Sequence, residues 1–250
     1  MKKIILFFLI VINCYACKQN EGVSNIEKNV SLKELYSRYR VIRENHENAD
    51  KELFDFELAL KNIFENKLLS NDSISSILKD NAVFFVKSND GKLIIPSWEV
   101  IDSGCLHAYR SMYRYENNKK IEVDYFVCKE KHFTEIISEM AYPYQVHILE
   151  DDNYLINSTS HVCGAHKQYS IRMLAFKNNK RIDCKNCFNG KPFFYTEIRR
   201  GLDIKPIFDS INKAIIYPEL VPYLKDGEDT GFEQHSGKFK KLTYKNGVFE

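Results

Sequence analysis

The spacing of apolar residues divides the chain into a helical first part and a strand-rich second part. Between residues 31 and 79, apolar side chains recur every three or four positions, as on one face of an α-helix. Ser31 and Glu34 have the spacing of a capping box, which marks a helix start. The predicted helices run from Ser31 to Ile42, from Asp50 to Lys67 and from Ser73 to Lys79.

After residue 81 the pattern becomes strand-like, and turn residues divide it into β-hairpins. The segment from Ser88 to Gly91 predicts a hairpin turn, because Asp90-Gly91 readily supplies the positive φ of tight turns, and Asn117-Asn118 and Asn178-Asn179 mark further turns. The predicted strand pairs are 82–87 with 93–100, 108–115 with 121–128, 144–149 with 154–157 and 169–176 with 181–184. Later strands are predicted over 193–199, 214–217, 239–244 and 247–250.

These elements predict a mainly β fold, α+β overall, in which a short N-terminal helical segment precedes an antiparallel β-meander. A sandwich, an open barrel and a small propeller all fit the pattern. We expect a helical segment over residues 31–80 and an antiparallel β domain over residues 81–250.

The first 17 residues have the pattern of a bacterial export signal that ends in a lipidation cysteine. Lys2 and Lys3 precede a short apolar run, and Ala16-Cys17 supplies the small residue and the cysteine of a lipoprotein cleavage site. The run is too short for a membrane-spanning helix. We therefore expect a signal peptide over residues 1–16, then the lipidated Cys17 and a flexible tether over 17–30, with the lipid as the membrane attachment.

The charge balance argues against nucleic acid as a partner. The chain has 36 basic and 34 acidic side chains, and removal of the signal peptide would remove two of the basic ones. A mature chain with a formal charge near zero lacks the positive field that polyanions require.

Five cysteines are candidates for disulfides in an oxidising envelope, because Cys17 would carry lipid and Cys14 would leave with the signal peptide. They are Cys105, Cys128, Cys163, Cys184 and Cys187. The Asn117-Asn118 turn aligns Cys128 with His107, two positions from Cys105. The Asn178-Asn179 turn aligns Cys184 with Met173, and a pairing of Cys163 with Cys184 or Cys187 is favoured over a redox pair formed by Cys184 and Cys187.

The same region offers an alternative to disulfides. Cys163, His166, Cys184 and Cys187 form two close pairs, the ligand types and grouping of a structural zinc site. Because exported cysteines are oxidised more often than metallated, we expect neither a metal nor another cofactor.

No motif fixes a catalytic chemistry. The sequence contains neither HExxH nor GxSxG, so the catalytic residues, if there are any, stay unknown. Carboxylates gather at Glu150-Asp151-Asp152 and in the run from Asp226 to Asp229, where calcium binding or glycoside hydrolysis is conceivable. Both groups fall in predicted turns, where Asp is common for backbone reasons.

The chain resembles the uncharacterised envelope lipoproteins of Bacteroidota. The resemblance rests on Cys17 with its polar tether, on the turn from Ser88 to Lys92 leading into Ser97-Trp98-Glu99, and on the closing segment from Tyr244 to Phe249. It implies a lipid-anchored protein of the cell envelope, in such bacteria usually of the outer membrane, and leaves open whether the protein faces the periplasm or the cell surface. It supplies no activity.

Three functions follow as hypotheses. The leading one is a lipid-anchored module that binds an extracellular ligand or another envelope protein, because hairpins and Tyr-rich strands abound and catalytic motifs are lacking. The alternatives are a glycan-directed hydrolase that uses carboxylates and a structural envelope protein.

Overall fold

A computed structural model of the chain describes residues 31–45, 49–78, 83–102, 107–126, 141–161, 166–199, 201–202 and 204–250. For residues 42–45, 49, 101, 102, 107 and 161 it describes the backbone alone. The described residues belong to one compact unit, Ser31–Glu250. The predicted signal peptide, Cys17 and tether lie outside the described residues. None of the described helices is both long and apolar enough to span a membrane.

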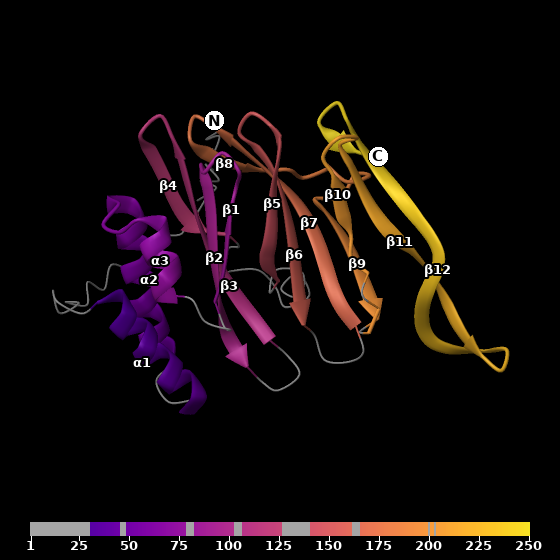
Figure 1. Cartoon of the computed structure of the whole chain (residues 1–250), viewed down its shortest axis with the longest axis horizontal. Coiled ribbons are helices and arrows are strands. Elements are labelled where there is room, and N and C mark those ends of the chain that lie inside the picture. The colour runs from indigo at the N-terminus through magenta and orange to yellow at the C-terminus, as the bar shows by residue number, and fades with distance from the viewer. Residues whose placement is uncertain are drawn as a thin grey trace, which may run out of the picture. The chain divides into compact units, whose positions relative to one another are not determined.

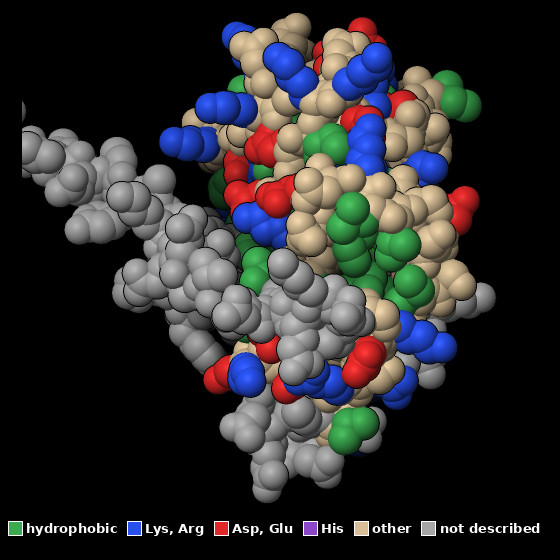
Figure 2. Space-filling view, turned by 90° about the vertical axis from the view of Figure 1, so that its left-hand side faces the viewer, with side chains coloured by type: hydrophobic (Ala, Val, Ile, Leu, Met, Phe, Trp, Pro, Cys, Tyr) green, Lys and Arg blue, Asp and Glu red, His purple; other side chains and the backbone are tan. Residues whose placement is uncertain are grey.

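Three helices come first, as the apolar spacing predicts. They are α1 (Leu32–Asn45), α2 (Ala49–Asn66) and α3 (Asn71–Leu78). At the start of α1, the Ser31 hydroxyl accepts a hydrogen bond from the Glu34 amide at 3.2 Å, which confirms Ser31 as the cap. Figure 2 shows basic and acidic side chains interspersed on the side of the molecule at the left of Figure 1.

The rest of the described chain forms three antiparallel sheets in succession (Figure 1), so the prediction of a mainly β, antiparallel fold after a short helical segment is confirmed. Sheet 1 contains β1 (Val83–Lys87), β2 (Leu93–Asp102), β3 (His107–Asn117) and β4 (Lys120–Tyr125). Sheet 2 contains β5 (Tyr142–Glu150), β6 (Asn153–His161), β7 (His166–Lys177), β8 (Lys180–Asp183) and β9 (Phe193–Arg199). Sheet 3 contains β10 (Ile207–Asp209), β11 (Ala214–Lys225), β12 (Glu228–Lys245) and β13 (Val248–Phe249).

Sheet 2 contributes to two separate hydrophobic cores, one with each neighbouring sheet. In the first core Tyr154 and Ile156 of β6 join side chains of sheet 1, and in the second Leu155 of β6 joins side chains of sheet 3. Successive side chains of a strand point to opposite faces. Sheet 2 is therefore covered on both faces, which explains why β6 is buried along most of its length and shows little alternation.

Two-residue turns with positive φ connect most of the hairpins. At Asn178-Asn179 φ is 53° and 63°, and the Cys184 amide donates to the Met173 carbonyl at 3.5 Å, which confirms the predicted register. Asp226-Gly227 forms a turn of the same kind, with φ of 55° and 87°.

The predicted Asn117-Asn118 turn is wrong by one residue. The turn consists of Asn118 and Lys119, so Asn117 pairs with Lys120 and the strand pairing shifts by two residues. Asn117 instead donates its side-chain amide to Asp152 at 3.1 Å. The alignment of Cys128 with His107 depended on the predicted turn and loses its support.

Sheet 3 is larger than the sequence predicts. β11 and β12 pair from Ala214↔Thr243 to Lys225↔Glu228, far beyond the predicted strands 214–217 and 239–244, and β10 has no predicted counterpart. Prolines at 218 and 222 and glycines at 231 and 237 obscure the strand pattern, because such residues usually end strands or mark bulges.

Polar side chains at the hairpin turns tie sheet 1 to sheet 2. Lys92 Nζ lies 2.7 Å from Asp152 Oδ1, and the Tyr154 hydroxyl donates to Asp90 at 2.8 Å. Partial burial acts to raise the pKa of Asp152, but hydrogen bonds from Lys92 and Tyr115 outweigh it and hold the pKa below its ordinary value. The ionised carboxylate of Asp152 therefore joins the turns of the two sheets.

A buried carboxylate holds the helices against the outer face of sheet 1. Glu57 of α2 is only 1% exposed and accepts hydrogen bonds from Trp98 Nε1 at 3.2 Å, Arg110 Nη1 at 2.5 Å and the Tyr125 hydroxyl at 2.7 Å. Burial and the Glu57 charge raise the pKa of Tyr125, so its hydroxyl keeps the donated proton. One side chain thus joins α2 to β2, β3 and β4.

We expect Glu57→Ala to lower the free energy of unfolding by about 3 kcal/mol, because it leaves buried donors and the Arg110 charge without their acceptor. Urea unfolding followed by the fluorescence of Trp98, the single tryptophan, measures the loss. Glu65→Ala is the matched control, since Glu65 lies on the same helix with its side chain 48% exposed and should cost less than about 0.5 kcal/mol. Equal effects of the two substitutions would contradict the role of Glu57.

Candidate functional site

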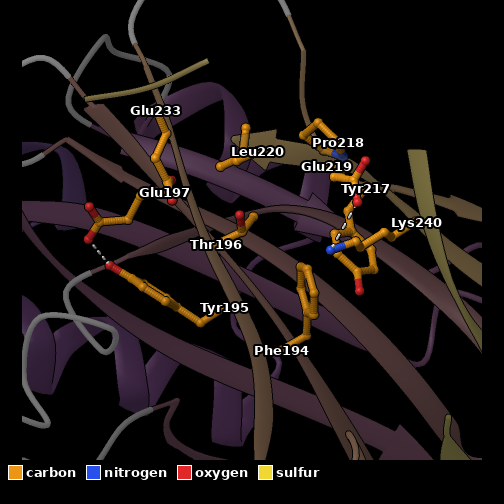
Figure 3. Close-up of a pocket in the computed structure, with 10 residues that line it drawn as sticks. All are labelled: Phe194, Tyr195, Thr196, Glu197, Tyr217, Pro218, Glu219, Leu220, Glu233 and Lys240. Atoms are coloured by element: carbon orange, nitrogen blue, oxygen red, sulfur yellow. Dashed lines mark hydrogen bonds and ion pairs between the residues drawn. The ribbon is translucent and has the colours of Figure 1, made fainter. Parts of the chain in front are cut away.

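A groove of about 420 Å³ lies between β9 of sheet 2 and the hairpin of β11 and β12 (Figure 3). Its volume falls in the usual range of ligand sites. The lining residues combine aromatic rings, carboxylates and a single lysine: Phe194, Tyr195, Thr196, Glu197, Tyr217, Pro218, Glu219, Leu220, Glu233 and Lys240.

The groove follows the edge of β9 and extends over both strands of the β11–β12 hairpin. It touches the consecutive residues 194–197 of β9 and 217–220 of β11, together with Glu233 and Lys240 of β12. Because successive side chains of a strand point to opposite faces, contact with consecutive residues of β9 indicates that the groove lies along its edge.

The edge of β9 opposite β7 lacks a strand partner among the described residues. β11 pairs with β12 on one side, and on its other side β10 covers only Ala214 to Ile216. The backbone groups of β9 that point away from β7 therefore border the groove without a ladder of hydrogen bonds.

The hairpin of β11 and β12 contacts β9 at the two ends of the groove. At one end the rings of Phe194 and Tyr217 lie 4.8 Å apart. At the other end the Arg199 guanidinium lies 5.7 Å from the centre of the Tyr223 ring. Between these contacts the pairing of β11 with β12 is irregular from Pro218 to Leu220, and this irregularity accompanies the hollow.

Hydrogen bonds hold two of the groove's carboxylates in place. Glu197 accepts a hydrogen bond from Gln168 Nε2 at 2.9 Å and another from the Tyr195 hydroxyl. Partial burial and this bond to Glu197 raise the pKa of Tyr195, so the phenol stays neutral. Figure 3 shows the hydrogen bond that joins the Tyr195 and Glu197 side chains, which are neighbours along β9.

On the opposite side, Glu219 accepts from the Ser236 hydroxyl at 3.0 Å and forms an ion pair with Lys240 at 3.3 Å. These two partners keep the pKa of Glu219 below its ordinary value. Glu219 is therefore an ionised acceptor and is poorly suited to act as a general acid.

The structure separates the residues of the zinc alternative. His166 begins β7, whereas Cys184 lies opposite Met173, seven residues further along that strand and thus roughly 23 Å away. The part of the chain that the structure describes contains no cluster of three or more His, Cys, Asp or Glu residues suited to a metal. Cys105, Cys128 and Cys163 lie outside the described residues.

Cys184 and Cys187 form a disulfide with each other, with Cα atoms 5.8 Å apart. The sequence favoured a bond from either one to Cys163. The loop that carries the disulfide binds the end of the chain: the Phe249 amide donates to the Cys187 carbonyl at 2.6 Å, and the Asn189 amide donates to the Phe249 carbonyl at 3.0 Å. The disulfide therefore shapes a connection between sheet 2 and sheet 3.

Comparison of the chain with protein families, with curated proteins and with solved structures yields no match. The function of the groove must therefore be argued from its own residues.

Sequence reasoning did not single out the groove. Its carboxylates are isolated in the sequence, and the two groups considered there, at 150–152 and 226–229, form hairpin turns. A signal was available in the run Phe193 to Arg199, which is predicted as a strand but has no predicted hairpin partner. A strand without a sequential partner often lies at a sheet edge.

We expect the double substitution Cys184→Ala and Cys187→Ala to lower the free energy of unfolding by up to about 2 kcal/mol, the loop entropy of so short a disulfide. Urea unfolding measures it. Reduction with dithiothreitol should destabilise the native chain by a similar amount more than it destabilises the double variant, which keeps Cys105, Cys128 and Cys163. A native chain that is indifferent to reduction would contradict the disulfide.

Proposed function

We propose that the protein is a binding module of the bacterial cell envelope, anchored through lipid on Cys17, that holds a segment of another envelope protein in the groove between β9 and β11. The observation that carries this proposal is the edge of β9, which borders the groove and has no strand partner beyond β7 in the part of the chain that the structure describes. Exposed strand edges bind other chains readily, and natural proteins usually block them.

The groove also has the composition of a recognition site. The aromatic rings of Phe194, Tyr195 and Tyr217 supply contact area, and the carboxylates held by hydrogen bonds can fix the orientation of a bound partner. Tyr195 is 39% exposed, so a partner can bury its ring on binding.

The alternative of a carboxylate-dependent hydrolase receives less support. Such an enzyme needs one carboxyl group whose pKa is raised, so that it can donate a proton, beside a second that is ionised. In the groove, Glu219 has its pKa lowered by Ser236 and Lys240, so it fits only the ionised role. Glu197 already accepts hydrogen bonds from two side chains. We therefore assign no proton donor in the groove, and hydrolysis stays the second hypothesis.

A photoreactive benzoylphenylalanine placed at Tyr195 should form one defined cross-linked product in intact cells. The matched control is the same probe at Ile182, which is 47% exposed on β8 of the same sheet but outside the groove. The product should disappear when Glu197→Gln and Glu233→Gln are combined with the probe.

Products of equal yield at both positions, or none at Tyr195, would contradict the groove as the binding site. A product that persists in the double glutamine variant would mean that the carboxylates take no part.

A further inference from the structure

We infer that the groove binds its partner as an extended, lysine- or arginine-rich segment that adds to the edge of β9 opposite β7, where the described residues supply no strand, as a further strand of sheet 2. This inference rests on the proposed function and names the chemistry of the bound segment.

The backbone of β9 offers a template for a strand. From Phe193 to Arg199 it pairs with β7 in a continuous antiparallel register. In such a pair, every second residue directs both its N–H and its C=O away from the partner. These groups of β9 face the groove side and can pair with an added peptide, as in other cases of strand addition.

β11 is the poorer template of the two edges. Pro218 and Pro222 lack an N–H, and the pairing of β11 with β12 is irregular near both of them. Proline on an edge strand is a known device against strand addition. The sequence of β9 contains no proline, so we assign the main-chain hydrogen bonds to β9.

The length of the groove limits the segment. Its ends are marked by the contact of Phe194 with Tyr217 and by the contact of Arg199 with Tyr223. The five residue steps from 194 to 199 span roughly 17 Å in a strand. At most about five residues of an extended peptide therefore fit between the two contacts, and β12, whose Phe232 ring lies 5.8 Å from the Arg199 guanidinium, narrows the space at that end.

The charge of the groove selects a basic segment. The lining includes three carboxylates, Glu197, Glu219 and Glu233, and one ammonium group, Lys240, a formal charge of −2 from three negative charges and one positive charge. The Arg199 guanidinium at the end of the groove adds one positive charge, so the groove stays negative overall. The aromatic rings can hold the aliphatic stem or the charged head of a lysine or arginine. A strand in which basic and apolar side chains alternate can therefore direct its basic side chains to the carboxylates and aromatic rings of the groove.

Charge also disfavours the pairing of β9 with β9 of a second copy. Two copies would bring two grooves of the same negative charge together, and like charges placed opposite one another destabilise an interface. A monomer that binds a basic segment is therefore expected over a homodimer formed through β9.

The test titrates the full chain with a capped five-residue peptide in which lysine alternates with valine, using isothermal calorimetry. A peptide with glutamate in place of lysine should not bind. Glu233→Gln, an exposed change on β12, should weaken binding of the lysine peptide by about tenfold. Glu65→Gln on α2 removes the same charge far from the groove along the chain and should leave binding unchanged.

Backbone pairing is tested with two further lysine peptides, each methylated at alternate backbone nitrogens but in opposite phase. Only one phase blocks the N–H groups that a strand presents to β9, so one peptide should lose about tenfold or more in affinity and the other should keep it. Equal loss or equal retention in both phases would overturn strand addition.

Failure of this inference differs from failure of the proposed function. If no lysine peptide binds but the cross-link at Tyr195 persists and depends on Glu197 and Glu233, the groove binds a partner by another chemistry and strand addition is wrong. If the cross-link is also missing, the proposed function itself is contradicted.

Discussion

Hydrogen bonding of the backbone at strand edges is the constraint on which the rest of the structure depends. The chain folds into three consecutive meanders, and each meander ends in edge strands whose N–H and C=O groups need partners. The faces of the sheets are covered by packing. Glu57 holds the helices on one side of sheet 1, and sheet 2 forms a hydrophobic core with each of its neighbours. The edge of β9 has no strand partner beyond β7 among the described residues, and that edge borders the groove.

Much of the fold could be predicted because local rules decide it. Apolar spacing located the helices, and Asn-Asn and Asp-Gly pairs located the hairpins, since the positive φ of such turns is a property of two adjacent residues. The predicted turn after β3 is misplaced by one residue, because the Asn117 side chain donates a hydrogen bond to Asp152 in a turn of sheet 2 and stays in the strand. The residues next to Asn117 in the sequence give no sign of this contact.

The groove could not be predicted, because it depends on which strands are neighbours in space. Phe194 and Tyr217 belong to different sheets, and their proximity follows from the packing of sheet 3 on sheet 2. The length of β12 could not be predicted for a related reason. Gly231 and Gly237 have positive φ (72° and 84°), which is unusual in a strand, and the strand continues through them because it pairs with β11. The disulfide of Cys184 with Cys187 likewise follows from a loop shape that the strand register alone does not define.

Amide hydrogen exchange across β9 tests the central claim most directly. In the free protein, the amides of Phe193 to Arg199 should alternate between slow exchange, where β7 accepts the hydrogen bond, and fast exchange on the groove side. On saturation with the alternating lysine peptide, the fast set should become protected while the slow set stays unchanged. A bound peptide that leaves the fast amides of β9 unprotected would contradict strand addition at this edge.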